Sequence, residues 1–251
     1  MHRTAPRLAR ILACAAVPVM LVAAGCSSDS GSDEKKTSNS SGESGGEDQG
    51  KGAEPAQSET EKAPAVEPAK FAKLPDTCDA ITAKSIGELV PSAKVKGGTA
   101  GRSTDTASRG SCSWNGLDDR GVKGSQYRWL DVSFLRYDSD ESLGVSAAER
   151  AGETYTKEIA KAQTTKGATK VRTAAVTGIG QVASTVTYQL KKTGEQFSYV
   201  TVVTRTENAV ITLTYNGTGY AGAKNPSVSN LLQKAVPAAK EAVAAVAKAN
   251  A

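Results

Sequence analysis

The side chains that most often carry acid–base and nucleophilic catalysis are scarce in this 251-residue chain. Its one histidine, His2, lies in an N-terminal segment that has the features of an export signal. Once residues 1–25 are removed, the mature sequence has no histidine. This excludes Ser-His-Asp and Cys-His nucleophile pairs and histidine-ligated zinc. The residue types therefore predict no catalytic residue, no cofactor and no metal site, and a protein that is not an enzyme.

The four cysteines indicate a lipid anchor and one disulfide. Cys14 lies inside the export signal, and Cys26 directly follows the small residues that end it. Cys78 and Cys112 remain, and two cysteines left in one extracytoplasmic domain most often pair. The sequence predicts a Cys78–Cys112 disulfide, worth about 3.5–4 kcal/mol in the chain-entropy model. Two free thiols are the alternative.

A carboxylate-based hydrolase is the enzymatic alternative that the sequence leaves open. The adjacent acids Asp118 and Asp119 would have to carry it. Glycosidase-type chemistry needs two carboxyl groups that face each other across the scissile bond. Adjacent acids in a glycine-rich loop are usually solvated, and the sequence identifies no partner acid for them.

Two further motifs fail in their sequence context. Asp138 opens an acidic loop with Glu149 at its twelfth position, as in an EF-hand, but Leu143 stands where that loop needs glycine. Gly178–Ala183 fits the dinucleotide pattern G-x-G-x-x-A, which requires a helix after the glycines. The strand-forming residues Ser184–Tyr188 follow instead. We therefore expect a solvated loop and a tight turn at these two places.

Residues 1–25 are predicted to be a lipoprotein signal peptide. Three arginines precede the apolar run Ile11–Ala24, whose 14 residues fall short of the ~20 that a spanning helix needs. The run ends in Leu21–Gly25 followed by Cys26. This resembles the lipobox of bacterial lipoproteins, whose cysteine receives a diacylglycerol before cleavage. The resemblance implies lipidation of Cys26 and a location on the outer face of the cytoplasmic membrane, extending into the cell wall.

Residues 26–70 are predicted to be a lipidated cysteine followed by a disordered tether. Ser, Gly, Glu, Asp, Lys, Ala and Pro dominate, and no Ile, Leu, Met, Phe, Trp or Tyr occurs from residue 27 to 70. Such a segment cannot bury enough apolar surface to offset its ordering entropy. Its reach of roughly 35–40 Å suits a spacer. An interaction tail or a glycosylated stalk is the alternative.

Residues 71–251 have the size of one domain with one core. They carry 23 of the basic and 16 of the acidic residues, a net charge of +7. The basic residues are spread along the sequence with no aromatic-interleaved stripe, so nucleic acid is not an expected partner. Solvated charge is the expectation, and attraction to anionic wall polymers is the alternative.

The hydrophobic patterns of this domain predict an α+β fold, in which an antiparallel meander sheet is packed by about three helices. Helices are expected at 82–90, at 146–162 and from Asn225-Pro226 to the C-terminus, and strands at 111–114, 127–137, 168–176, 181–190, 196–205 and 209–215. Ser146 and Glu149 form a capping box. Pro237 is expected to kink or split the last helix. In the strand 127–137, Leu130, Val132 and Phe134 fall on one face and Trp129, Asp131 and Ser133 on the other. Trp129 is expected in the core, with a surface role in ligand contact as the alternative.

Three short motifs, in order, resemble the actinobacterial lipoproteins of domain-of-unknown-function family 3558. They are Asp76-Thr77-Cys78 ahead of a helix, Cys112-Ser113-Trp114, and Gly178–Ala183 ahead of a strand. Thr77 and Ile179 replace the more usual proline and leucine. The resemblance implies a cell-envelope lipoprotein with a paired-cysteine α+β domain of PsbP-like architecture, and it implies no reaction.

The favoured function is a non-catalytic binding or accessory domain in the cell envelope. Its partners would be the membrane, through the lipid on Cys26, and an unknown envelope ligand or protein. A structural wall spacer and the carboxylate hydrolase are the alternatives. A cleft beside the sheet would favour binding, whereas a smooth surface would favour the spacer.

Overall fold

A computed structural model describes residues 65–251 of the chain. The predicted signal peptide 1–25, the lipidation site Cys26 and most of the tether 26–70 lie outside the described residues. Within 65–251, no helix is both long and apolar enough to cross a membrane.

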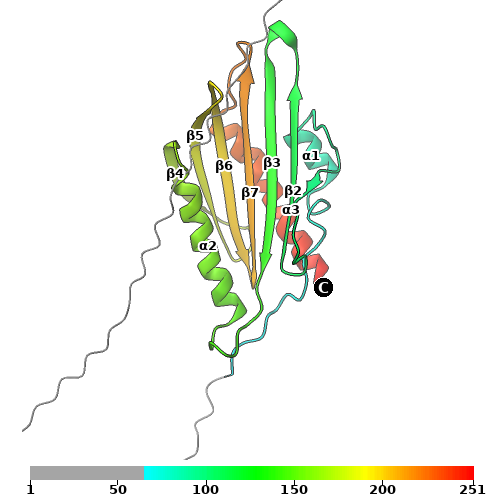
Figure 1. The fold of residues 1–251 in the computed structure, drawn as a ribbon, viewed down its shortest axis with the longest axis vertical. Coiled ribbons are helices and arrows are strands. Elements are labelled where there is room, and N and C mark those ends of the chain that lie inside the picture. The colour runs from blue at the N-terminus through cyan, green and yellow to red at the C-terminus, as the bar shows by residue number, and fades with distance from the viewer. Residues whose placement is uncertain (1–64) are drawn as a thin grey trace, which may run out of the picture. The chain divides into compact units, whose positions relative to one another are not determined.

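Seven antiparallel strands form one sheet in the order β1-β2-β3-β7-β6-β5-β4 (Figure 1). The strands are β1 (Thr99–Ala100), β2 (Arg109–Asp118), β3 (Ser125–Arg136), β4 (Thr169–Val176), β5 (Val182–Lys192), β6 (Glu195–Thr206) and β7 (Ala209–Tyr220). Strands β4 to β7 form the predicted meander, and the hairpin β2–β3 joins it through β3 and β7. The central strands β7 and β6 are rich in Val, Ile and Thr, which suit a pleated surface that is buried on both sides.

Helices cover both faces of the sheet. They are α1 (Ala83–Leu89), α2 (Ala147–Gln163) and α3 (Val228–Ala249), and a short 3₁₀ turn, Gly121–Lys123, lies between β2 and β3. In Figure 1, α2 lies in front of β5 and β6, and α3 crosses behind the sheet. The predicted α+β class, with an antiparallel meander and three helices, is confirmed.

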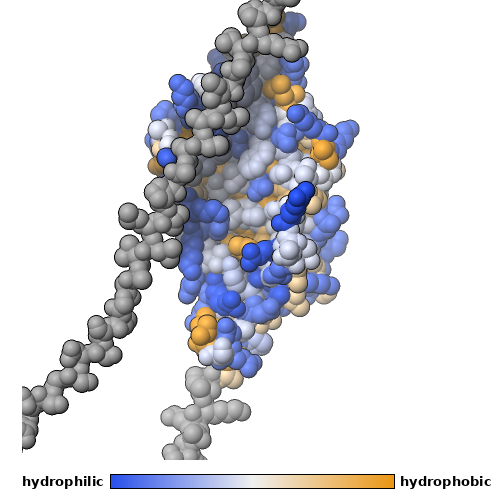
Figure 2. All heavy atoms as spheres, viewed as in Figure 1, coloured by the Kyte–Doolittle hydropathy of each residue, from blue (hydrophilic) through white to orange (hydrophobic). Residues whose placement is uncertain are grey.

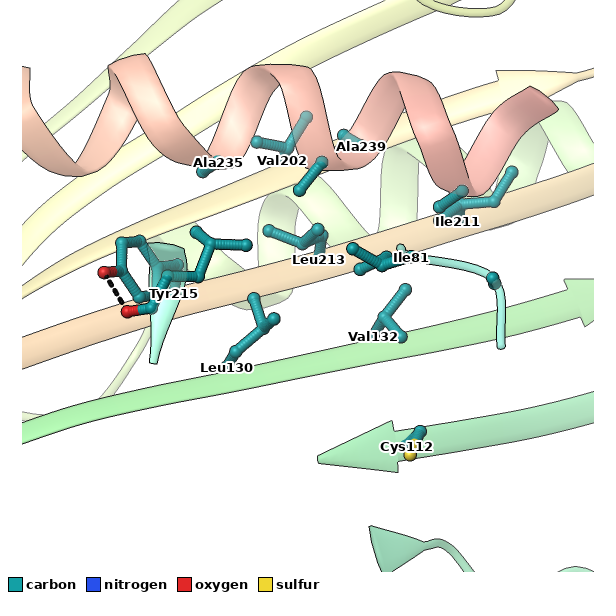
Figure 3. Close-up of a cluster of buried hydrophobic side chains, with 14 of the residues drawn as sticks. Ile81, Cys112, Leu130, Val132, Val202, Ile211, Leu213, Tyr215, Ala235 and Ala239 are labelled. Carbon is teal, nitrogen blue, oxygen red and sulfur yellow. Dashed lines mark hydrogen bonds between the residues drawn. The ribbon is translucent and has the colours of Figure 1, made fainter. Parts of the chain in front are cut away.

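The main core lies between α3 and the sheet. Figure 3 shows side chains of β3 and β7, among them Leu130 and Leu213, on the side where Ala235 and Ala239 of α3 lie. The α3 stripe that contacts the sheet consists largely of alanine, so the helix axis can approach the strands closely. Tyr215 closes one end of this core by donating from its hydroxyl to the Leu89 carbonyl at 2.6 Å.

The N-terminal end of the described chain lies on the domain beside the β6–β7 turn. The Asn208 side chain accepts from Phe71 N at 2.8 Å and donates to Phe71 O at 2.9 Å. Lys70 pairs with Glu207 at 2.7 Å. Further along, the side-chain Oδ1 of Asn250 accepts from Ala72 N at 2.8 Å. The segment that leads back towards residue 64 therefore enters the domain at the β6–β7 end of the sheet.

The structure joins Cys78 to Cys112 in a disulfide. Cys78 precedes α1, and Cys112 is a buried residue of β2, so the bond ties the segment that carries α1 to the sheet. Trp114, two residues further along β2, is buried beside it and donates from its indole to the Lys96 carbonyl at 3.2 Å.

The predicted helix starts agree with the structure in two cases out of three. Thr82 caps α1, and Ser146 with Glu149 forms the capping box of α2. The predicted start of the last helix at Asn225-Pro226 is wrong, because Ser227 is the N-cap and accepts from Asn230 N. The Asn225 side chain instead accepts from Gly219 N at 2.8 Å and so holds the end of β7.

Other predicted boundaries need correction. Strand β2 spans ten residues, where four were expected, and β7 continues beyond Tyr215 to Tyr220. The polar and glycine-rich end of β7 has low strand propensity, but pairing with β3 and β6 on either side overrides it. Pro237 does not split α3, which runs unbroken from Val228 to Ala249.

Candidate ligand-binding cavity

The helix α2 covers only part of its face of the sheet. Its half-buried Tyr155 and Ile159 pack on β5, β6 and β7, and Tyr155 Oη lies 2.8 Å from Ser184 Oγ. The helix ends at Gln163, near Tyr188 of β5. On the same face, the side chains of β3 beyond the helix remain partly open to solvent. A cavity forms on this open region.

The cavity has a volume of about 380 Å³, which is within the range of small-molecule pockets. We call it the aromatic cavity, and it is lined by Tyr127, Trp129, Lys192, Thr193, Phe197, Tyr199, Asn216 and Tyr220. These residues come from β3, β5, β6, β7 and the β5–β6 turn, so the sheet itself brings them together. Five of the eight are aromatic, although aromatic residues make up 5% of the whole chain.

The aromatic rings brace one another. Tyr127 meets Phe197 edge to face, with ring centroids 6.0 Å apart and an interplanar angle of 76°. Tyr199 stacks on Tyr188 of β5, with centroids 4.8 Å apart and planes within 7°. Lys192 places its ammonium group 5.4 Å from the centre of the Tyr199 ring. Such contacts fix ring orientation, so the wall of the cavity is formed before any ligand arrives.

The strand register places the polar residue Asn216 of β7 between an aromatic residue of β3 and one of β6. Trp129 lies opposite Asn216, and Asn216 lies opposite Tyr199. Gly217 permits this close pairing, because a Cβ there would lie 2.6 Å from the Tyr127 carbonyl oxygen. Asn216 therefore lies on the middle one of three paired strands, between the strands that carry Trp129 and Tyr199.

The Asn216 side chain is the most unusual group in the cavity. The residue is only 3% exposed, but its side chain lines the cavity, and its amide forms no hydrogen bond to another group within residues 65–251. The amide keeps its contact with solvent through the cavity, since the fully buried side-chain atoms without a partner in these residues belong to Gln126 and Gln196. An amide that is held in this way inside a cavity is available to donate to and accept from a ligand.

Asp131 lies next to the aromatic cavity on the same face of β3. It follows Trp129 by two residues, and the structure gives its carboxylate no hydrogen bond or ion pair within the described chain. Burial raises the pKa of Asp131 to about 6, and the charge of Lys161 on α2 opposes that rise only in part. At neutral pH the open face therefore carries a poorly solvated carboxylate.

A second cavity of about 220 Å³ lies further along the same face. It includes Ser133 and Leu135 of β3, Arg109 of β2, and Glu158 and Lys161 of α2. Lys161 pairs with Glu158 at 3.3 Å, so the charges of α2 at this wall largely neutralise each other. Ser133 follows Asp131 by two residues, so Asp131 lies between the two cavities.

The acids proposed for a hydrolase lie elsewhere, in the β2–β3 connection. Asp118 pairs with Arg120 at 2.8 Å. Asp119 accepts from Gly121 N and from Ser125 Oγ, both at 2.9 Å, and these hydrogen bonds lower its pKa. Both carboxylates are engaged in local contacts that hold the turn between the two strands.

The other two sequence motifs are accounted for by local structure. Asp138 accepts two hydrogen bonds from Arg136, one of them at 3.0 Å, and Glu149 accepts from Ser146 N at 2.8 Å. Gly178 and Gly180 both have positive φ values, and strand β5 follows at Val182. The expected tight turn before a strand is therefore confirmed.

Trp129 departs from its expected place in the core. Its ring lines the aromatic cavity and is partly exposed, whereas the core position belongs to Trp114 on the neighbouring strand. The alternation of β3, in which Leu130 and Val132 face the core, already placed Trp129 on the other face.

The remaining members of the cavity, among them Asn216, could not be found from sequence, because the β7 strand was expected to end before Asn216.

Comparisons with known proteins identify no family. No protein-family model matches the chain, so the resemblance to family 3558 has no support from such a model. No curated protein matches either. A solved structure that matches is LpqN, described as involved in cell envelope biogenesis of Mycobacterium tuberculosis, with 16% identity and a TM-score of 0.31. The match covers 52% of this chain and 68% of that one, and at this similarity it carries no argument about function.

Proposed function

We propose that this protein is a membrane-anchored extracytoplasmic lipoprotein whose domain binds an envelope ligand in the aromatic cavity without transforming it. The lipobox-like segment that ends at Cys26 and the polar tether after it support the anchored, extracytoplasmic part of the proposal. The pre-formed cavity supports the binding part, since a structural wall spacer would not require one.

The observation that carries the proposal is the Asn216 amide, which lines the aromatic cavity on the strand between Trp129 and Tyr199 and has no hydrogen-bond partner within residues 65–251. A few polar groups set in a mostly aromatic wall are typical of small-molecule sites. In a ligand complex, the amide would gain the hydrogen bonds that it lacks, and the rings of Trp129 and Tyr127 would supply flat contact area.

The position of the cavity fits a protein that is tethered from its N-terminus. The chain enters the domain beside Asn208, at the β6–β7 turn. Tyr199, in the cavity, lies nine residues before Asn208 and in the same β6–β7 hairpin, which corresponds to about 27–30 Å of strand at ~3.3 Å per residue. The cavity therefore lies at the end of the sheet away from the tether.

A fluorescence titration tests this function. In the full-length chain with Cys26→Ser, the further change Trp114→Phe leaves Trp129 as the only tryptophan. A detergent extract of cell envelopes should change the Trp129 emission saturably. Asn216→Ala should weaken the affinity measured by this titration about tenfold. The matched control is Asn230→Ala, which removes an exposed amide on α3 and should leave the titration unchanged.

The same titration can contradict the proposal. If Trp129 emission does not respond to any extract while near-UV circular dichroism shows a folded protein, the cavity is not a ligand site. If a component of the extract is consumed and a product appears, the non-catalytic part of the proposal is wrong.

A further inference from the structure

The two cavities on the open face belong to one line of side chains along β3. Tyr127, Trp129, Asp131 and Ser133 alternate on the same face of the strand. The first two line the aromatic cavity, Ser133 lines the second cavity, and Asp131 lies between them. From Tyr127 to Ser133 the strand rises about 20 Å at ~3.4 Å per residue. We call this line and the two cavities the β3 groove.

The surface of this face fits an extended site. Figure 2 shows pale and orange residues at the centre of the visible face, with blue, hydrophilic residues among them and along its margins. The α2 helix bounds the groove on one side through Glu158 and Lys161. A ligand lying along β3 would contact rings at one end, a carboxylate at the middle and hydroxyl and guanidinium groups at the other end.

The hydrogen-bonding groups of the groove require a ligand that both donates and accepts. The Asn216 amide offers two donors and an acceptor, and the Asp131 carboxylate offers acceptors alone. Neither has a partner within the described residues. Hydroxyl groups satisfy both, because each hydroxyl donates to a carboxylate and accepts from an amide.

The groups at the middle of the groove argue against two other ligand classes. A polyanion would meet the cations Lys192, Arg102 and Arg109 at the two ends of the groove, but it would place charge beside the Asp131 carboxylate between them, whose solvation is already poor. An acyl chain would bury Asn216 and Asp131 against hydrocarbon and leave both without partners, which is costly. An uncharged ligand with many hydroxyls and flat apolar faces meets neither obstacle.

We propose that the β3 groove binds an uncharged oligosaccharide of several sugar units, with sugar rings stacked on Trp129 and Tyr127 and hydroxyls bonded to Asn216 and Asp131. This inference rests on the proposed function and names the chemical class of its ligand. It also extends the site beyond the aromatic cavity to Asp131 and the second cavity.

The test is a titration of the full-length chain with Cys26→Ser and Trp114→Phe, using neutral oligosaccharides of one to six units in glucan, mannan, galactan, arabinan and N-acetylglucosamine series. Calorimetry and Trp129 emission measure affinity. One series should bind, and its affinity should rise about tenfold or more from one unit to four, because longer chains reach Asp131 and the second cavity. Asp131→Ala should weaken the four-unit ligand about tenfold and the single sugar little.

A matched variant and three other ligands make the outcome decisive. Asp79→Ala removes an exposed aspartate outside the groove and should leave binding unchanged. Polyphosphate, sodium palmitate and a wall stem peptide are titrated in parallel. If one of these changes Trp129 emission and no sugar does, the oligosaccharide class is wrong and the binding function stands. If affinity is the same for one sugar and for four, the extended groove is wrong. If nothing binds to the folded protein, both proposals fail.

Discussion

Replacing Asp131 with asparagine should stabilise the protein at neutral pH. The pKa of Asp131 rises from its ordinary 3.8 to about 6 because burial disfavours the charged form. That difference of about two pH units corresponds to at most about 3 kcal/mol of destabilisation by the carboxylate at pH 7.5. Because the groove is partly open to solvent, which screens the charge, we expect about half of this, roughly 1–1.5 kcal/mol.

The sign of the pH dependence follows from proton binding. Between the unfolded and folded pKa values, the folded state binds more protons at Asp131 than the unfolded state does. The contribution of Asp131 to the free energy of unfolding therefore falls as pH rises from about 4 to about 6.5. Asp131→Asn lacks this titration, so its advantage over the wild type should be near zero at pH 4 and complete at pH 7.5.

Urea unfolding at pH 4 and pH 7.5 measures this effect. The midpoint of Asp131→Asn should exceed that of the wild type at pH 7.5 alone, with unchanged m-values. Asp138→Asn is the opposite control, because hydrogen bonds from Arg136 lower the pKa of Asp138. That variant should lose stability at pH 7.5, and the loss should shrink as pH falls. An Asp131→Asn variant that is less stable than the wild type at pH 7.5 would refute the reasoning, since it would mean that the carboxylate has a favourable partner.

Three other predictions concern the anchor, the disulfide and the core. Cys26→Ser should release the protein into the medium or leave it unprocessed, and an unmodified Cys26 in intact-mass analysis of membrane-extracted protein would contradict lipidation. Replacing both Cys78 and Cys112 with alanine should lower the free energy of unfolding by about 3.5–4 kcal/mol in the chain-entropy model, as measured by urea unfolding against the wild type. Equal midpoints would argue against a bond in the native protein, as would alkylation of both thiols. Tyr215→Phe leaves the Leu89 carbonyl without its donor and should cost about 1–2 kcal/mol, whereas a neutral result would mean that water replaces the hydroxyl.

The sequence predicted most of the fold because its local signals agree with the tertiary structure. The alternation around Leu130 and Val132 identified the core face of β3, and the capping box at Ser146 identified the start of α2. The predicted strand boundaries were wrong where pairing with neighbouring strands overrides a low strand propensity. The end of β7 beyond Tyr215 is polar and glycine-rich, and only its two neighbouring strands make it part of the sheet.

Because the predicted β7 ended too early, the sequence analysis could not identify the aromatic cavity. Asn216 could not be assigned to a cavity while its strand was expected to end one residue earlier. The register that places Asn216 between Trp129 and Tyr199 depends on strand order, which a single sequence does not reveal. Only Trp129 gave a local signal, as a large aromatic residue on the polar face of a strand.

Nuclear magnetic resonance of the ¹⁵N-labelled protein tests the central claim, binding in the aromatic cavity, most directly. We predict that an envelope extract will shift the side-chain amide signals of Asn216 and the indole N–H signal of Trp129 saturably. The indole of Trp114, which donates to Lys96 in the core, is an internal control and should not move. Shifts confined to residues outside the cavity, or no shifts at any extract concentration, would contradict the account.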